Sequence, residues 1–492
     1  MSKVYLIGAG PGDPDLITWK GRKILAQAEC VLFDHLASEA LLDIAPLTAE
    51  RIYVGKKKSD HSRSQDEICD LLIDRARRGL IVVRLKGGDP FIFGRGGEEV
   101  EALADAGIPF EVVPGVTSPL GIAAYTGVPL THRSHTSVVT FVTGHSTEAI
   151  DWDKVGAAET LVVFMGLTAI GEIARQILAR GRAPDTPAMA VRWGTRPDQQ
   201  TIVGTLSTIA SLVDAAHMKP PATIIVGEVV GLRGKLNWYE NLPLFGQRIL
   251  VTRARGQASV LSEKLHALGA GTIELPVIEL CPPVDARPLD DAIARLGEFA
   301  WIVFTSVNGV RFFLDRLDLS QNDLRQLRAR ICAIGPATRR AIEDLHLKVD
   351  LMPREFVGES LLDAFAGHEL NGKRVLLPRA AVARDLIPDA LALRGALVEV
   401  VEAYRSVVPP GAEARAHEMF AGAHPPHWVT FTSSSTVDNL VAAAGLDALK
   451  QTRIASIGPV TSATVRRHGL NVDVEAETYT IDGLVSAILA RK

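Results

Sequence analysis

Two glycine-rich segments stand where a ligand could approach the backbone closely. Gly8–Asp13 follows the apolar run Val4–Ile7, and Gly87–Gly97 follows a second apolar run, Ile81–Leu85. Glycines permit close approach, and each segment carries an aspartate that can accept hydrogen bonds. The first has Asp13 where a dinucleotide fingerprint needs its third glycine, and the second lacks the Gly-Lys-Ser/Thr ending of a P-loop. The segments predict a small-molecule site of another kind.

Charged side chains near these segments could handle protons and anionic groups. Asp34 ends the predicted strand Cys30–Phe33 and is either a general base or a strand-end cap. Lys56–Lys58 and the pair His132–Arg133 would suit carboxylates, although a charge run is also typical of a solvated face. His132 and His135 have a ligand-like spacing without a third ligand nearby, so we expect no metal.

The second half of the chain carries hydroxyl groups directly after predicted strands, where open α/β sheets bind ligands. It shows no Ser/His/Asp order, no metal-ligand cluster and no paired-carboxylate motif. These residues alone predict a two-lobed α/β domain that binds a polar or anionic ligand. The candidates are Thr305, Ser306, Tyr404, Ser433, Ser434 and Thr461.

The elements that must position these groups alternate in type along the chain. Short apolar runs and amphipathic stretches follow one another through all 492 residues, which predicts an α/β fold with largely parallel sheets. A composition break at residues 231–245 predicts a linker between two halves. The second half repeats itself, because 246–253 aligns with 372–379 at an offset of 126 and 301–306 aligns with 428–433 at an offset of 127.

Composition excludes several classes of protein. Apolar residues make up 47% of the chain and the net charge is −4, which argues against disorder and against a general nucleic-acid binder. No apolar run reaches the roughly 20 residues of a membrane span, and the N-terminus does not look like a signal peptide. Four scattered cysteines indicate reduced thiols. We expect a cytoplasmic protein that binds small molecules, not nucleic acid or membrane.

A series of motifs in the first half occurs together and in a fixed order. They are Gly8–Asp13, Tyr53–Lys56, Arg84–Arg95, Pro114–Ser118, Gly127–Arg133, Thr143–His145, Phe164–Gly166, Gly194–Thr195 and Pro221–Glu228. Over residues 1–240 the series resembles uroporphyrinogen-III C-methyltransferase. The resemblance implies a tetrapyrrole methylase of two subdomains, with a break near residues 115–135, that uses S-adenosylmethionine and no metal. It also implies a homodimer formed through this half.

The same resemblance implies roles for individual residues. Asp34 matches the proton acceptor proposed for the family, and Lys56 matches its proposed donor. His132 and Arg133 are candidates for binding substrate carboxylates. The positions that match cofactor contacts are Pro11, Gly87, Gly88, Asp89, Ile92, Thr117, Ser118, Met165, Gly194 and Ala222.

The repeat and the strand-end motifs of residues 246–492 resemble uroporphyrinogen-III synthase. That family has two flavodoxin-like lobes, which implies one lobe from 246–281 plus 409–492 and the other from 286–403. Tyr404 matches the tyrosine proposed to assist the departing hydroxyl group. The residues then expected to hold substrate carboxylates are Thr305, Ser306, Ser433, Ser434 and Thr461.

Together the two resemblances imply a bifunctional enzyme of tetrapyrrole synthesis. The second half would cyclise hydroxymethylbilane to uroporphyrinogen III, with inversion of ring D and loss of water. The first half would methylate that product at C2 and C7 to give precorrin-2. The alternative is a methylase of a later corrinoid intermediate whose second half only binds tetrapyrrole. The matches at 87–95 and 131–133 favour the early substrate.

Overall fold

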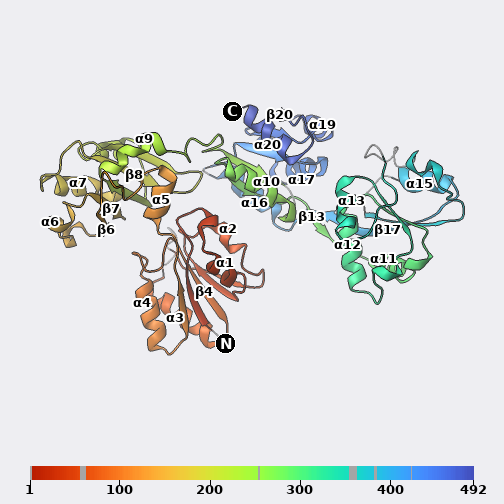
Figure 1. The fold of residues 1–492 in the computed structure, drawn as a ribbon, viewed down its shortest axis with the longest axis horizontal. Helices are drawn as coiled ribbons and strands as arrows, with labels where there is room; N and C mark the ends of the chain where they lie inside the picture. Colours follow the sequence, from red (N-terminus) through yellow and green to blue (C-terminus); the bar gives the residue numbers. More distant parts are fainter. Residues whose placement is uncertain are drawn as a thin grey trace. The chain divides into compact units, whose positions relative to one another are not determined.

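The chain divides into two compact units, each described by itself. The computed structural model describes residues 3–55, 63–252, 255–353, 363–381, 385–422 and 424–491. One unit comprises Met1–Ile249 and Glu263–Thr272, and the other comprises Leu250–Ser262 and Ile273–Arg491. Within the described residues the named strands form four five-stranded sheets (Figure 1). The expected α/β fold is confirmed.

The first sheet is parallel throughout, with strand order β3-β2-β4-β1-β5. Its inner strands are apolar on both faces because helices pack on both sides, α1 and α2 on one and α3 and α4 on the other. The strands are β1 (Lys3–Gly8), β2 (Cys30–Phe33), β3 (Glu50–Tyr53), β4 (Ile81–Lys86) and β5 (Phe110–Val113). The helices are α1 (Trp19–Leu25), α2 (Glu39–Leu42), α3 (Gln65–Arg77), α4 (Gly96–Asp105) and α5 (Ser118–Thr126).

The second sheet is mixed, with order β6-β7-β10-β8-β9, and differs here from the expected parallel arrangement. Only β6 and β7 pair in parallel, whereas β10 and β9 pair antiparallel with their neighbours. For β8 and β9 the reason is local, because the short loop between them cannot make the crossover that parallel strands require. The strands are β6 (Val139–Thr143), β7 (Thr160–Phe164), β8 (Pro187–Arg192), β9 (Gln200–Thr205) and β10 (Ala222–Val226). The helices are α6 (Trp152–Val155), α7 (Ile170–Leu178), α8 (Ile209–Ala215) and α9 (Arg233–Leu236).

The third sheet has the order β12-β11-β18-β19-β20 and draws its strands from both ends of the second half. Its core is built on Val429, Phe431 and Leu440, which are fully buried. The strands are β11 (Arg248–Val251), β12 (Gly271–Glu274), β18 (Trp428–Phe431), β19 (Arg453–Ser456) and β20 (Val474–Glu475). The helices are α10 (Arg255–Ala267), α16 (Ala412–Ala421), α17 (Ser434–Ala444), α18 (Leu446–Leu449), α19 (Pro459–Arg467) and α20 (Ile481–Ala490).

The fourth sheet has the order β13-β17-β16-β14-β15, in which only β13 is antiparallel to its neighbour. Because β13 pairs with β17, residues 279–281 join this sheet rather than the third, where the expected lobe boundary would place them. The strands are β13 (Glu279–Cys281), β14 (Trp301–Phe304), β15 (Arg330–Ala333), β16 (Arg374–Ala380) and β17 (Leu397–Val407). The helices are α11 (Arg287–Ala294), α12 (Val307–Asp318), α13 (Pro336–Glu343) and α15 (Leu386–Leu393).

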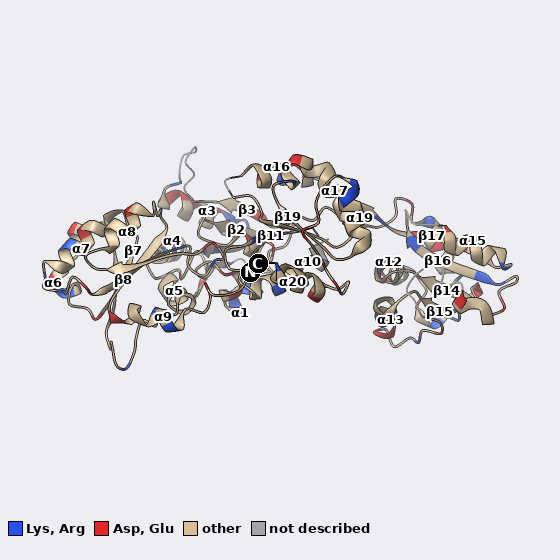
Figure 2. Cartoon of the chain, turned by 90° about the horizontal axis from the view of Figure 1, so that it is seen from above, with Lys and Arg blue, Asp and Glu red and all other residues tan. Residues whose placement is uncertain are grey.

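Charge and thiol environments follow the expectations from composition. Acidic and basic residues are interspersed along the helices (Figure 2). All four cysteines lie within the described residues and are free thiols. Burial raises the pKa of Cys30 to about 12, which keeps this thiol protonated and unreactive at neutral pH. Among the described residues no helix is both long and apolar enough to cross a membrane.

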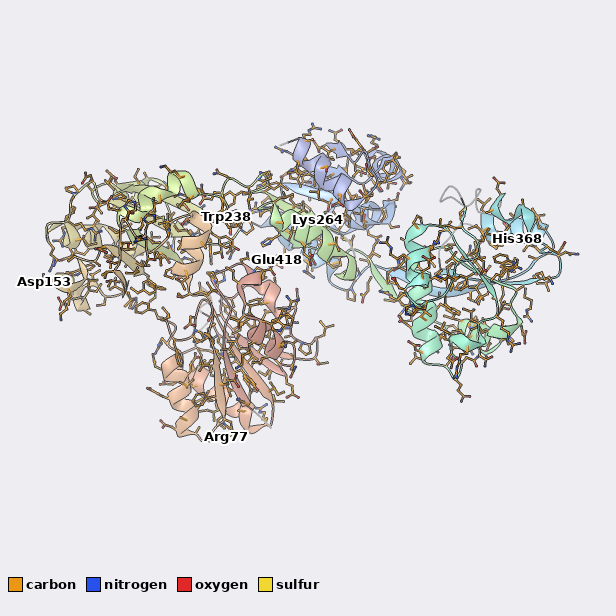
Figure 3. The ribbon with its side chains drawn as sticks, viewed as in Figure 1. Arg77, Asp153, Trp238, Lys264, His368 and Glu418 are labelled. Atoms are coloured by element: carbon orange, nitrogen blue, oxygen red, sulfur yellow. The ribbon has the colours of Figure 1, made fainter. Side chains whose placement is uncertain are left out.

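The predicted linker, residues 231–245, packs against the first unit instead of hanging free. Tyr239 and Leu244 are 3% and 1% exposed, and the ring of Tyr239 lies 4.7 Å from that of Tyr125 in α5. Trp238 donates from its indole Nε1 to the carbonyl oxygen of Ala124 over 2.8 Å (Figure 3). The composition break predicted a linker here, and the aromatic side chains within it have an apolar surface to bury.

Three loops of the first sheet meet through backbone alone, which generates a prediction. A Cβ on Gly115 would lie 2.7 Å from Gly8 Cα and closer still to the carbonyl oxygen of Gly88. We expect Gly115→Ala to destabilise the first unit by about 1–3 kcal/mol, since backbone atoms cannot move aside cheaply. Calorimetric melting of the full chain should show a transition lowered by about 2–4 °C per kcal/mol.

Gly97→Ala is the matched control for this variant. Gly97 lies in α4, and a Cβ there would meet nothing within 4 Å. Alanine favours a helix interior over glycine by about 0.5–1 kcal/mol, so this change should leave the transition unchanged or raise it. Equal melting temperatures for the two variants would contradict the backbone-contact argument.

Candidate active sites

The glycine-rich segments after β1 and β4 form one compact group. Gly10 and Gly88 exchange two backbone hydrogen bonds, of 3.2 Å from the Gly10 N–H and 2.7 Å from the Gly88 N–H. A Cβ on Gly8 would lie 2.5 Å from Gly115 Cα, so these loops approach at a distance that only glycine permits. The carboxyl ends of three parallel strands, β1, β4 and β5, therefore present backbone groups at one place.

Asp89 holds these glycine-rich loops together through hydrogen bonds of its carboxylate. Its Oδ1 accepts a hydrogen bond from the Phe91 N–H over 2.8 Å, and its Oδ2 accepts one from the Gly115 N–H over 2.9 Å. Asp89 therefore ties the loop after β4 to the loop after β5. A carboxylate has about four acceptor positions, so lone pairs remain for a ligand.

Three further predicted cofactor positions lie at the same end of three inner strands of the second sheet. Met165 directly follows β7, Gly194 follows β8 and Ala222 begins β10. The strand register places Ala222 opposite Arg192, the last residue of β8, so both lie at the same end of the strands. Met165 is 51% exposed and has a φ of 52°, a left-handed conformation that is sparsely populated outside glycine.

Side-chain contacts bring the two groups together. A Cβ on Gly121, in α5, would collide with Pro11 Cγ and would lie 2.9 Å from Thr195 Cγ2. The backbone N–H of Asp13 donates to Thr195 Oγ1 over 3.0 Å. On the other side, the ring of Phe93 lies 4.8 Å from that of Phe164, so the loop that carries Ile92 reaches the residue before Met165.

Asp34 lies beside the same loops and is held at both carboxylate oxygens. Its Oδ2 accepts from Arg84 Nη2 over 3.0 Å, and its Oδ1 accepts from the Leu36 N–H over 3.0 Å. A Cβ on Gly87 would collide with Leu36 Cβ, which places the turn after Asp34 directly against the second glycine-rich segment. The next residue, His35, makes an edge contact of 5.5 Å with the ring of Trp193.

A buried ionic network behind Asp34 was missed by the sequence reasoning. Glu99 in α4 is fully buried, and its Oε1 accepts from Lys86 Nζ over 2.8 Å and from Arg84 Nε over 3.2 Å. Burial, assisted by the neighbouring Arg84, lowers the pKa of Lys86. Two cations in an otherwise apolar strand, at positions 84 and 86, were the signal that could have revealed the network.

The other predicted residues of the first half are Lys56, His132 and Arg133. Lys56 lies outside the described residues. His132 accepts at Nδ1 from the Ser134 N–H over 3.2 Å, and its ring lies 4.8 Å from that of His135. Its neighbour Arg133 is exposed. The recorded contacts of His132 therefore stabilise its own turn, and its predicted contact with substrate stays a prediction.

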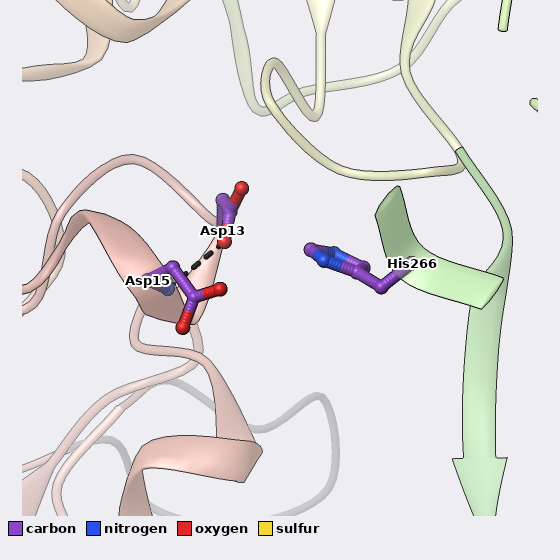
Figure 4. A group of neighbouring side chains, drawn as sticks. All are labelled: Asp13, Asp15 and His266. Atoms are coloured by element: carbon purple, nitrogen blue, oxygen red, sulfur yellow. Dashed lines mark hydrogen bonds between the residues drawn. The ribbon is translucent and has the colours of Figure 1, made fainter. Parts of the chain in front are cut away.

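One group of side chains has ligand atoms close enough for a metal ion. The ligand atoms of Asp13, Asp15 and His266 lie within 4.8 Å of one another (Figure 4). Asp13 already accepts hydrogen bonds from the Asp15 N–H over 2.9 Å and from the hydroxyl of Tyr125 over 2.5 Å. Its carboxylate therefore has structural partners, and the group by itself does not indicate a metal site.

In the fourth sheet the structure pairs two of the predicted synthase residues. The hydroxyl groups of Ser306 and Tyr404 lie 3.1 Å apart, and Ser306 Oγ also accepts from the Gly309 N–H, which caps α12. Tyr404 is buried on β17, and its ring stacks on that of Phe312 with centroids 5.5 Å apart. Thr305, half-buried, directly follows β14.

In the third sheet the other predicted hydroxyls gather at the starts of two adjacent helices. Ser433 caps α17 by accepting from the Thr436 N–H over 3.3 Å. Ser434 Oγ accepts from Thr464 Oγ1 over 2.9 Å, which joins α17 to α19. Thr461 lies in the first turn of α19 and is 5% exposed. Sequence reasoning missed Thr464, whose only signal was its spacing of three residues from Thr461 on one helix face.

Family models match both halves of the chain. Residues 3–210 match the tetrapyrrole (corrin/porphyrin) methylases, and residues 259–486 match uroporphyrinogen-III synthase HemD. The resemblances drawn from the sequence are thus confirmed for each half.

Curated relatives fall into two kinds. The porphyrin biosynthesis protein HemD of Ruminiclostridium josui is 36% identical over 493 aligned positions, covering 99% of this chain and 97% of the relative. The siroheme synthase of Pseudomonas putida is 52% identical over 242 positions, covering 48% of this chain and 52% of the relative. The chain thus spans about half of the length of the siroheme synthases that it matches.

Solved structures resemble each half separately. The uroporphyrin-III C-methyl transferase of Thermus thermophilus, complexed with S-adenyl homocysteine, is 43% identical with a TM-score of 0.42, covering 47% of this chain and 99% of its own. A mutant uroporphyrinogen III synthase from the same organism is 22% identical with a TM-score of 0.38, covering 50% of this chain and 100% of its own.

The relative from Ruminiclostridium josui aligns across both halves and the junction between them, and each half matches its own family model. This chain is a bifunctional enzyme of tetrapyrrole biosynthesis, and it belongs to the family of porphyrin biosynthesis proteins in which a tetrapyrrole methylase is fused to a uroporphyrinogen-III synthase.

Proposed function

We propose that this enzyme converts hydroxymethylbilane to precorrin-2 in two steps. The synthase half closes the linear bilane to uroporphyrinogen III, with inversion of ring D and loss of water. The methyltransferase half then places methyl groups on C2 and C7 of that product. The order follows from the chemistry, because the first reaction supplies the substrate of the second.

The observation that carries the proposal is the meeting of two separate residue groups beside Asp34. The loops after β1, β4 and β5 contribute backbone groups. The ends of β7, β8 and β10 in the second sheet contribute Met165, Gly194 and Ala222. Contacts of Pro11 and Thr195 with Gly121 join the groups. A cofactor held between them would lie beside the turn that follows Asp34, because Leu36 of that turn packs against Gly87.

The residues present fit S-adenosylmethionine. The glycine loops leave backbone groups uncovered by side chains. Thr117, the N-cap residue of α5, makes no side-chain capping hydrogen bond, so the Ser118 N–H at the start of the helix can donate to a carboxylate. The contacts would be Pro11, Gly87, Gly88, Asp89, Ile92, Thr117, Ser118, Met165, Gly194 and Ala222. When bound, the sulfonium supplies an electrophilic methyl group.

The chain's own residues orient the reactants and move a proton. Methylation of a pyrrole carbon ends with loss of a proton from the macrocycle, and Asp34 is the base that we assign to this step. Arg84 and the Leu36 N–H fix the orientation of its carboxylate. The loops would orient the substrate toward the bound cofactor, which lowers the entropic part of the barrier.

In the synthase half, Tyr404 donates a hydrogen bond to the departing hydroxyl of the bilane. Ser306, 3.1 Å from it, holds the phenol in place. The pyrrole nitrogens provide most of the driving force for hydroxide loss, so the enzyme mainly folds the chain for attack by the correct carbon. Thr305, Ser306, Ser433, Ser434 and Thr461 would hold the carboxylates of the substrate.

One observation bears on the setting in which the enzyme works. Free thiols at all four cysteines support a cytoplasmic location, because disulfides are rare there. We place the methyltransferase at residues 1–240 and the synthase at 246–492, and we assign a homodimer formed through the methyltransferase half. Sedimentation of the full chain and of a methyltransferase fragment would test the dimer.

One experiment tests both activities. The enzyme is supplied with hydroxymethylbilane, with or without S-adenosylmethionine. The products are separated by chromatography and identified by mass spectrometry. We expect uroporphyrinogen III without the cofactor and a product heavier by two methyl groups with it. Formation of only the uninverted isomer would show that the second half is a binding module. Methylation of a later corrinoid but not of uroporphyrinogen III would identify the alternative methylase.

Asp34→Asn should lower methylation turnover by roughly 10²–10⁴-fold, the usual contribution of a general base. The amide keeps an acceptor for Arg84, so binding of S-adenosylhomocysteine should be unchanged. Steady-state methylation of uroporphyrinogen III and calorimetry measure the two quantities. Asp43→Asn, at an exposed aspartate, is the control. Turnover equal to the control would remove Asp34 from the mechanism.

Asp89→Ala should weaken S-adenosylhomocysteine binding by about tenfold or more, because charged hydrogen bonds contribute about 1.5–3 kcal/mol each. The variant frees the N–H groups of Phe91 and Gly115 and loosens the loops that they hold. Titration calorimetry provides the affinity, and Asp105→Ala, at an exposed helix end, is the matched control. An unchanged affinity would refute the bracing role.

Tyr404→Phe should slow formation of uroporphyrinogen III by roughly 10²-fold, since only the proton-donating hydroxyl is lost. Stacking on Phe312 is retained, so the melting temperature should hardly change. The readout is the ratio of inverted to uninverted isomer from hydroxymethylbilane. An isomer ratio and rate like those of the unaltered enzyme would exclude Tyr404 from the reaction.

A further inference from the structure

The segment Arg233–Phe245, here called the junction strap, lies across the methylase half. Arg233 Nη1 donates to the carbonyl oxygen of Thr126, at the end of α5, over 2.8 Å. The Arg233 side chain is 12% exposed and forms an ion pair with Glu240, which is 19% exposed. The start of the strap is therefore tied to α5 through Arg233, and Trp238 and Tyr239 add aromatic contacts with Tyr125.

Glu240 connects the strap to the loop after β8. Its Oε1 accepts from Gln199 Nε2 over 2.7 Å and from Thr201 Oγ1 over 2.6 Å. Gln199, 5% exposed, uses its own Oε1 to accept from the Thr195 N–H over 2.8 Å. Glu240 thus fixes the orientation of the Gln199 side-chain amide. In that orientation the amide oxygen of Gln199 faces the Thr195 N–H and accepts its hydrogen bond.

Thr195 is the residue on which these contacts converge. It is fully buried with a φ of 70°, a conformation that needs support from its surroundings. The hydroxyl of Tyr239 donates to its carbonyl oxygen over 3.3 Å, and its Oγ1 accepts from the Asp13 N–H over 3.0 Å. Its neighbour Gly194 is a proposed cofactor contact. Thr195 thus joins the strap to both cofactor loops.

We propose that the junction strap is a positioning element for the cofactor loops of the methylase, acting through Tyr239 and Glu240. The strap fixes the backbone conformation of Thr195. Thr195 in turn holds the loop Pro11–Asp13 in contact with the loop that carries Gly194. The inference rests on the proposed use of S-adenosylmethionine. Neither Tyr239 nor Glu240 touches the reacting atoms, so their effect is on cofactor affinity rather than on the methyl-transfer step.

The test uses the full chain, with S-adenosylhomocysteine as the calorimetric probe and S-adenosylmethionine in the assay. Glu240→Ala should weaken probe binding and raise the cofactor KM by about tenfold, because it frees Gln199 and Thr201 together. We expect kcat and the KM for uroporphyrinogen III to change much less. Glu240→Gln keeps an acceptor oxygen for Gln199 and should restore most of the affinity.

Tyr239→Phe is the second variant, and it decides the question should Glu240→Ala not fold. It removes only the hydroxyl that supports Thr195 and should raise the cofactor KM by about two- to fivefold. Lys235→Ala changes an exposed residue of the same strap and is the matched control. Cyclisation of hydroxymethylbilane by the same preparations should be unchanged in all variants.

The outcomes separate this inference from the proposed function. An unaltered enzyme that neither binds the probe nor methylates uroporphyrinogen III would overturn the proposed function itself. An unaltered enzyme that binds, with Glu240→Ala and Tyr239→Phe binding equally well, would overturn only the positioning role. A fall in kcat at constant cofactor KM would also overturn it, because that pattern belongs to the chemical step.

Discussion

Backbone contact between Gly8, Gly88 and Gly115 is the constraint on which the candidate methylase site depends. Three parallel strands end side by side, and their loops come so close that a single Cβ would push them apart. The absence of side chains does two things at once. It lets Asp89 reach across to the Gly115 N–H, and it leaves peptide groups exposed for a ligand. Site geometry is therefore decided by the sheet rather than by flexible loops.

Burial of charge behind Asp34 is the second requirement. Glu99, Arg84 and Lys86 are at least 95% buried at their side chains, an arrangement that costs desolvation energy and is rarely the most stable choice. The network fixes the orientation of the Arg84 guanidinium, because its hydrogen bond to Glu99 limits its movement. The guanidinium in turn fixes the Asp34 carboxylate. A carboxylate so held is ready to accept a proton without first reorganising.

Sequence patterns predicted the strands around this site closely, because apolar runs ended by glycine allow few alternatives. The run Val4–Ile7 lies within β1, and Ile81–Leu85 lies within β4. Three features escaped prediction: the antiparallel β8–β9 pair, the packed junction and the left-handed φ of Thr195. The packed junction and the conformation of Thr195 depend on contacts between residues far apart in sequence, such as Tyr125 with Tyr239 and Asp13 with Thr195. A Tyr239 at 3% exposure, for example, has no local signal that distinguishes it from a linker tyrosine.

In the second half the sequence repeat and the sheets do not coincide, and this accounts for how its candidate residues meet. Each sheet combines strands from both copies, since β11 of the first copy pairs with β18 of the second, and β16 of the second pairs with β14 of the first. Ser306 and Ser433 occupy equivalent repeat positions, and each caps the helix that follows its strand. Tyr404, however, belongs to the second copy and contacts Ser306 of the first. The hydroxyl pair of the fourth sheet therefore exists only because the two copies exchange strands, so neither copy alone contains both members of this candidate pair.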